Sequence, residues 1–174
     1  MEKLLERKEF YIGVVTEQEK IHELASDLRY AGYDASNSVV VTVSSDYSAF
    51  IGQYVRHYLS FDGEIAQGFA IDVPYPDETW DEQYVYELNV LLDMYSYSFP
   101  NKTLILVEAG VIRGGNYTYI TDVLKKDYPD INVVTCALFE NKHSKFKSDF
   151  VCEYYDDDIE DLTFWWEKYN KHWR

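Results

Sequence analysis

A carboxylate followed closely by three glycines is the part of this sequence best suited to chemistry. An apolar stretch, 104–107, leads directly to Glu108, and a segment of helical character, 116–126, follows the glycines. The glycines lie within residues 110–115, here called the glycine loop: Gly110, Gly114 and Gly115. Backbone N–H groups in such a turn, together with the positive end of a helix dipole, suit a phosphate. A carboxylate beside them can accept hydrogen bonds from a sugar diol. The alternative is a tight strand-to-helix turn that needs glycine only for its backbone angles.

Other residue types near this loop have two interpretations each. The guanidinium of Arg113 is suited to a two-pronged contact with phosphate, but it could equally form an ion pair with one of the many acids. The three lysines of segment 142–147 are the nearest approach to a basic patch, and we interpret them as part of a solvated loop. The four histidines show no spacing typical of a hydrolase triad, and no zinc or EF-hand spacing is present.

The composition limits the classes of protein to consider. The 174 residues fit one domain, and 31 acidic against 16 basic side chains give a net charge of −15. Such a charge disfavours nucleic acid as a partner. The 17 tyrosines argue for a packed globule rather than a disordered chain. Neither Cys136 nor Cys152 has metal-site spacing, and we find no signal-peptide or membrane-span pattern, so we expect a cytoplasmic protein with reduced thiols.

Strand and helix patterns alternate along the chain. Thr16 with Glu19 predicts a capping box at the start of the first helix. The β-branched run 39–43 is typical of a central parallel strand, and a polar loop is expected over 44–48 after it. The remaining strands are predicted near 10–15, 68–73, 104–107, 132–138 and 150–154, and the remaining helices near 16–31, 49–59, 80–97 and 116–126. This alternation predicts an α/β fold with a mostly parallel central sheet flanked by helices.

Several segments, in this order, resemble the type I phosphoribosyltransferases, in particular the purine-salvage, xanthine-guanine kind. The similar segments are 16–30 (the opening helix), 41–59 (a strand, pyrophosphate loop and helix), 107–116 (the glycine loop), 146–151 (part of the hood that covers the base) and 164–167. The resemblance implies one domain over residues 1–174, with a helical insert at about 74–99 and a hood at about 140–174. It also implies transfer of phosphoribose between phosphoribosyl pyrophosphate (PRPP) and a purine-type base, and a homo-oligomer.

The resemblance also implies roles for individual residues. Glu108 and Arg113 would be catalytic, and Glu108 together with Asp46 would hold Mg²⁺. The substrate would be contacted by Ser44, Ser45, Gly110, Gly114, Gly115, Asn116, Tyr117, Thr118, Lys147, Phe150 and Val151.

The sequence also departs from the family pattern. Segment 45–47 replaces the basic residue and glycine of the pyrophosphate loop, and Ala109 replaces the second acid that binds the diol. Loss of such contacts weakens transition-state stabilisation by about 2–4 kcal/mol each, which argues for weak or altered chemistry. The alternative function is therefore an inactive relative that binds a nucleotide, or a protein partner through an acidic, tyrosine-rich surface. A third interpretation is that only the fold is shared.

Overall fold

The computed structural model describes residues 9–43, 45–71, 93, 101–156 and 161–164. Ten helices and strands follow one another along this part of the chain: β1 (Glu9–Ile12), α1 (Val14–Tyr30), β2 (Ser38–Val43), α2 (Ser45–Tyr58), β3 (Gln67–Ile71), β4 (Thr103–Val111), α4 (Gly115–Asp127), β5 (Val133–Asn141), β6 (Phe150–Tyr155) and β7 (Asp161–Phe164). The helix predicted over 80–97 lies outside the described residues, apart from Asp93.

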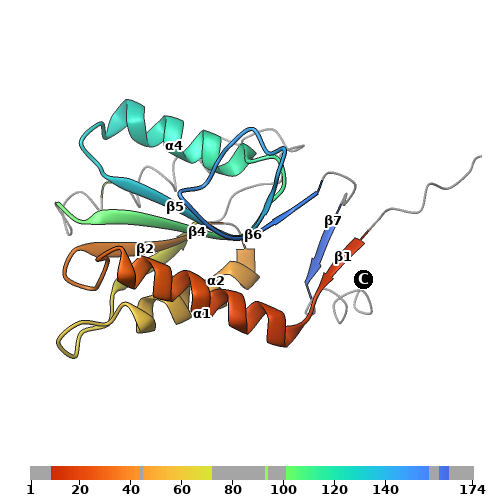
Figure 1. Ribbon diagram of the computed structural model, residues 1–174. Helices are drawn as coiled ribbons and strands as arrows, with labels where there is room; N and C mark the ends of the chain where they lie inside the picture. The colour runs from red at the N-terminus through yellow and green to blue at the C-terminus, as the bar shows by residue number, and fades with distance from the viewer. Residues whose placement is uncertain (1–8, 44, 72–92, 94–100, 157–160, 165–174) are drawn as a thin grey trace, which may run out of the picture.

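Five strands form a parallel sheet in the order β3-β2-β4-β5-β6 (Figure 1). All six residues of β2 are buried, as a β-branched run in the middle of a parallel sheet requires. Helices α1 and α2 cover one face of the sheet, and α4 covers the other. The predicted α/β fold with a parallel central sheet flanked by helices is confirmed.

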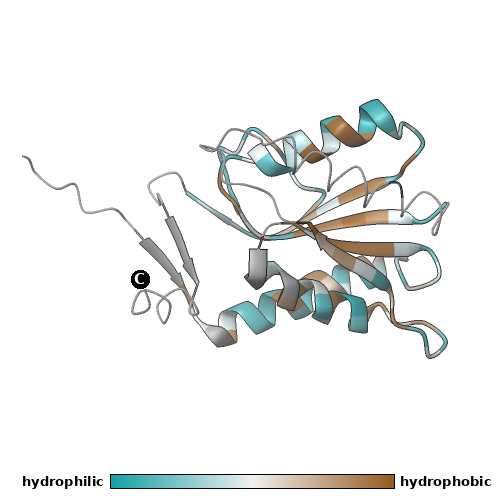
Figure 2. Cartoon of the chain, turned by 180° about the vertical axis from the view of Figure 1, so that it is seen from behind, coloured by the Kyte–Doolittle hydropathy of each residue, from teal (hydrophilic) through white to brown (hydrophobic). Residues whose placement is uncertain are grey.

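Two apolar clusters fill the space between the sheet and its helices. Leu24, Leu28 and Ile51 belong to the cluster under α1 and α2, whereas Tyr117 and Ile120 belong to the cluster under α4. The central strands are correspondingly the most hydrophobic segments, and polar residues gather on the outer sides of the helices (Figure 2). Neither face of the sheet is free, so the positions left for a polar site are the ends of the strands.

The two remaining strands form a separate parallel pair. β1 pairs with β7, so that Ile12 lies beside Phe164. This pair stands to one side of the main sheet (Figure 1). β6, which falls within the expected hood region, is instead the edge strand of the main sheet. Within the described residues, no helix is both long and apolar enough to cross a lipid bilayer.

Three local predictions are wrong in detail. Helix α1 begins at Val14 with Gly13 as its N-cap and no capping side chain, so the capping box at Thr16 does not form. The polar loop expected over 44–48 is largely helical, because α2 begins at Ser45 directly after the buried strand β2. Strand β4 does not end at Val107 but continues to Val111, because the main-chain pairing with β5 extends that far. Glu108 is therefore inside a strand.

Candidate functional site

The strand order places a topological switch point at the carboxyl edge of the sheet, between β2 and β4. β2 leads through α2 to β3 on one side, whereas β4 leads through α4 to β5 on the other side. Because the chain leaves these neighbouring strands in opposite directions, the two connections diverge, and ligands of open α/β sheets bind at such a point. The connections that meet there follow Val43 and Val111. The glycine loop is one of them, as the sequence predicted.

Gly114 makes the turn between β4 and α4. Its φ of 76° lies in the left-handed region, and it is the N-cap of α4 without any side-chain hydrogen bond to the helix. A Cβ at this position would lie 2.3 Å from the Cβ of Phe146, so the position has no room for a side chain. A helix of 13 residues thus begins with amide groups that no cap side chain satisfies. Such a terminus favours a negatively charged group.

Glu108 faces this terminus from β4. Its Oε1 accepts a hydrogen bond of 2.9 Å from Nδ2 of Asn116, in the first turn of α4. The Glu108 side chain is 9% exposed, and its burial raises the pKa of the carboxyl to about 7, although the hydrogen bond from Asn116 opposes the rise. The other end of the Asn116 amide, Oδ1, is buried and has no hydrogen-bond partner among the described residues. The pair therefore retains an unused acceptor.

A second loop contributes a hydroxyl to the same place. Asn141, at the end of β5, forms a turn in which its Oδ1 accepts from the His143 N–H and its carbonyl accepts from the Ser144 N–H, at 2.8 and 2.9 Å. This turn places Ser144 Oγ 2.9 Å from where a Cβ of Gly114 would be. Ser144 is 5% exposed, and within the described residues its hydroxyl has no partner. Sequence reasoning missed Ser144, since its type and spacing carry no signal.

The other predicted residues of the glycine loop have different surroundings. The Tyr117 side chain is fully buried, and its hydroxyl donates to the carbonyl groups of Cys136 and Leu106. Burial raises its pKa well above the ordinary value. The Thr118 hydroxyl donates back to the Gly114 carbonyl at 2.9 Å. Only the backbone of Tyr117 is therefore suited to ligand contact.

Three further predicted residues, Arg113, Gly115 and Gly110, differ in their surroundings. Arg113 is exposed at the tip of the connection, and a Cβ on Gly115 would meet nothing within 4 Å. Gly110 lies in β4 beside Phe139 of β5. Gly110, expected in the loop, is thus inside the strand, and the open positions at the turn are Arg113 and Gly115.

The predicted residues of the hood segment are not brought together at the site. The Lys147 ammonium lies 3.4 Å from Oε1 of the buried Glu140 and donates to the Lys142 carbonyl at 2.9 Å. Lys147 is thus held within its own loop. Phe150 packs against the cluster under α1 and contacts the ring of Tyr33 edge-on, on the face of the sheet opposite α4.

Val151 is placed differently from Phe150. It pairs with Ala137, which in turn pairs with Glu108, so the three residues lie at one level of the sheet. Because paired residues of neighbouring strands point to the same face, Val151 shares the face of Glu108 at a distance of two strands.

Of the two expected Mg²⁺ ligands, only the Glu108 side chain lies among those that the structure describes. No three His, Cys, Asp or Glu side chains are grouped in the described part of the chain, and one oxygen of Glu108 already accepts from an amide N–H. Ser44 lies outside the described residues, as do the side chains of Ser45 and Asp46. The role of Asp46 as a metal ligand therefore stays a prediction, and we derive no step through the ion.

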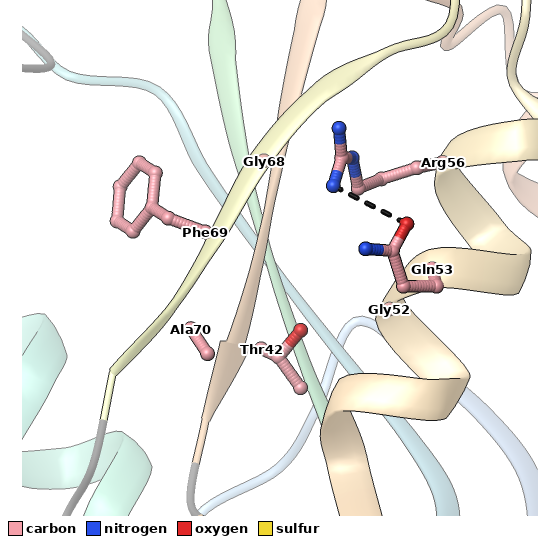
Figure 3. Close-up of a pocket in the computed structure, with 7 residues that line it drawn as sticks. All are labelled: Thr42, Gly52, Gln53, Arg56, Gly68, Phe69 and Ala70. Atoms are coloured by element: carbon pink, nitrogen blue, oxygen red, sulfur yellow. Dashed lines mark hydrogen bonds between the residues drawn. The ribbon is translucent and has the colours of Figure 1, made fainter.

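A small pocket of about 150 Å³ lies elsewhere, between α2 and the edge strand β3. Figure 3 shows Arg56 and Gln53 projecting from α2 toward β3, with the ring of Phe69 on the other side of that strand. The Arg56 guanidinium donates to the Ala66 carbonyl at 2.8 Å and to Gln53 Oε1 at 3.3 Å. The Arg56 guanidinium thus connects α2 to the residue directly before β3. None of the predicted site residues lines this pocket.

The five-stranded parallel sheet with its flanking helices is similar in fold to solved phosphoribosyltransferases. The chain is similar over 95% of its length to 97% of the xanthine-guanine-hypoxanthine phosphoribosyltransferase of Helicobacter pylori, with a TM-score of 0.61 and 17% identity. A purine phosphoribosyltransferase from Pyrococcus horikoshii matches 91% of the chain over 93% of its own, with a TM-score of 0.63 and 16% identity.

A third solved structure was determined with a nucleotide bound. It is a hypothetical protein from Neisseria gonorrhoeae with bound ppGpp, and 95% of each chain matches with a TM-score of 0.64 and 16% identity. No protein-family model and no curated protein sequence matches the chain. At these identities the likeness establishes the fold.

Proposed function

We propose that this protein binds a ribose 5-phosphate ligand, either PRPP or a purine nucleotide, at the glycine loop. The observation that carries the proposal is the cluster of Glu108, Asn116 and Ser144 around the uncapped start of α4. The helix terminus and the Ser144 hydroxyl supply donors for a phosphate, and Glu108 with Asn116 supplies acceptors for sugar hydroxyls. The purine phosphoribosyltransferases and the ppGpp-bound protein with the same fold support this class of ligand.

The reaction proposed for this ligand is transfer of phosphoribose to a purine-type base. The bond between ribose C1 and pyrophosphate breaks, a bond from C1 to a ring nitrogen forms, and the proton of that nitrogen passes to solvent or to the departing pyrophosphate. Glu108 would hold the ribose, and Arg113, exposed at the loop tip, would face the departing pyrophosphate. Mg²⁺ and a homo-oligomer remain predictions of the resemblance.

Binding without turnover is the second candidate. Two observations favour it: Glu108 is buried beside an amide rather than a second acid, and Lys147 is held by Glu140 instead of extending toward a base. Either feature would weaken the contacts that distinguish a transition state from a bound ligand. In this case a nucleotide would be the ligand of the glycine loop, and a protein partner would meet another surface.

Calorimetric titration with GMP and with PRPP tests the proposal. We expect saturable binding to the wild type and at least tenfold weaker binding to Glu108→Ala. Glu64→Ala is the matched control, because Glu64 is an exposed carboxylate in a turn between α2 and β3. Equal affinity of the wild type and Glu108→Ala for both ligands would contradict the proposal.

A turnover assay then separates the two candidates. Pyrophosphate release from PRPP with guanine, xanthine or hypoxanthine as acceptor indicates transfer. Saturable binding without release under the same conditions indicates the second candidate.

A further inference from the structure

The pocket between α2 and the edge strand β3 is hollow because three of its lining residues are small. These residues are Gly52 of α2 and Gly68 and Ala70 of β3. A Cβ on Gly68 would lie 2.6 Å from Cδ of Arg56, and a Cβ on Gly52 would lie 2.1 Å from Oγ1 of Thr42. Larger residues at the two glycine positions would therefore displace two polar side chains that the fold brings to the pocket.

Three side chains that can donate hydrogen bonds line this pocket, namely those of Thr42, Gln53 and Arg56. Thr42 is 5% exposed, so its hydroxyl belongs to the floor of the pocket. Gln53 accepts from Arg56 through Oε1, and Figure 3 shows its amide nitrogen directed toward the strands. A hydroxyl, an amide NH₂ group and a guanidinium are together suited to a ligand that carries acceptors.

The positive charge of Arg56 has only neutral partners in the described part of the chain. Its guanidinium donates to the Ala66 carbonyl at 2.8 Å and to Gln53 Oε1 at 3.3 Å, and no ion pair of Arg56 is present among the described residues. Each of these bonds uses one N–H group, so other N–H groups of the guanidinium remain for a ligand. The planar fork of N–H groups matches a carboxylate in two-pronged fashion.

From this arrangement we propose that the pocket binds a small carboxylate, with Arg56 as the charged partner and Thr42 and Gln53 as further donors. The volume of about 150 Å³ suits a small organic acid, since pockets for drug-sized ligands are typically about 300–1,000 Å³. The net charge of −15 favours a single negative charge over a phosphate dianion, because one arginine must overcome the repulsion of the whole chain. The site shares no residue with the glycine loop, so the inference goes beyond the proposed function.

An NMR titration of the ¹⁵N-labelled protein with sodium acetate tests the inference residue by residue. Acetate replaces chloride at constant ionic strength, so that general screening of charges stays the same. We expect saturable chemical-shift changes of the Gly52 and Gly68 amides, with a dissociation constant in the millimolar range, because acetate has few atoms. The Gly114 and Gly115 amides report on the glycine loop and should not change. Absence of saturable changes at Gly52 and Gly68 overturns the inference.

Variants of the lining residues test which groups hold the carboxylate. Arg56→Gln should weaken acetate binding by about tenfold or more, and Thr42→Val, which keeps the branched shape without the hydroxyl, by about threefold or more. Arg29→Gln is the matched control, because Arg29 of α1 also donates to a backbone carbonyl, that of Ser60, at 2.9 Å, and does not line the pocket. Unchanged acetate affinity of Arg56→Gln, or an equal loss in Arg29→Gln, overturns the inference. The wild-type titration and Thr42→Val keep the test decisive if Arg56→Gln does not fold.

A titration with inorganic phosphate, followed at the same amides, tests the class of ligand. We expect phosphate to change the Gly52 and Gly68 amides at higher concentrations than acetate does. Tighter binding of phosphate than of acetate at these two amides overturns the assignment to carboxylates. Failure of GMP and PRPP to bind would contradict the proposed function and leave the acetate result unaffected, so the two proposals fail separately.

Discussion

Two buried glutamates, Glu108 on β4 and Glu140 on the neighbouring β5, have opposite environments. Glu140 is 0% exposed, accepts from the Ser148 N–H at 2.9 Å, and has the Lys147 ammonium 3.4 Å from its other oxygen. Glu108 has one neutral amide as its partner, and burial raises the pKa of its carboxyl to about 7. Glu140 is thus held by an ammonium and a loop amide, whereas the described residues place a neutral amide and no cation beside Glu108. Burial alone does not distinguish the two carboxyl groups; the charge of their partners does.

The largest expected effect concerns the pH dependence of the contribution of Glu108 to stability. Its folded pKa of about 7 lies above the ordinary value of 4.5, so the folded state binds the proton more tightly than the unfolded state. The contribution of Glu108 is therefore fully present below pH 4.5 and is lost as the pH rises through 7. Relative to Glu108→Gln, the wild type should lose on the order of 3 kcal/mol of unfolding free energy between pH 4.5 and 8.

Urea unfolding of the wild type and Glu108→Gln at several pH values measures this difference. Subtracting the unfolding free energy of the variant from that of the wild type cancels the contributions of all other carboxyl groups, since these are common to both proteins. A difference that does not change with pH would remove the contrast between the two glutamates.

Glu140→Gln tests the other side of the comparison. The change removes the charge that faces Lys147 and weakens the hydrogen bond from the Ser148 N–H, with an expected loss of about 2 kcal/mol in unfolding free energy. Lys147→Met is the control, and it should cost less than about 1 kcal/mol because the Lys147 side chain is 53% exposed. Denaturant unfolding at one pH measures both. A larger loss for Lys147→Met than for Glu140→Gln would show that the ion pair, and not the loop amide, is the main contact.

The smallest of the three effects concerns the glycine loop, which connects β4, the strand of Glu108, to α4. Gly114→Ala should reduce the unfolding free energy by about 1–2 kcal/mol, because φ is 76° and Phe146, from the loop after β5, leaves no room for a Cβ. Gly115→Ala is the adjacent control: a Cβ there meets nothing within 4 Å, and alanine favours the helix. The control should be neutral or stabilising by up to about 1 kcal/mol in thermal or urea unfolding. Equal losses in both variants would mean that the contact between the two loops contributes nothing.

The sequence predicted most of the described helices and strands, β7 excepted, because their signals are local. The run 39–43 is β-branched throughout, and residues 104–107 are apolar, so both are identified as buried strands without knowledge of their neighbours. The extension of β4 through Glu108 to Val111 had no such signal. A charged residue and a glycine interrupt the apolar pattern there, and only the ladder with β5 keeps the backbone extended.

What the sequence determined by itself is the order of strands and helices, the glycine loop and a carboxylate next to it. These depend on backbone conformation and on hydrophobic periodicity, which act over a few residues. The tertiary structure decided what each polar group does. It placed Asn116 against Glu108, brought Ser144 from another loop onto Gly114, and engaged Lys147 with Glu140. Such contacts join residues distant along the chain or depend on how the loops pack, and their energies follow from burial and partners that residue type and spacing do not specify.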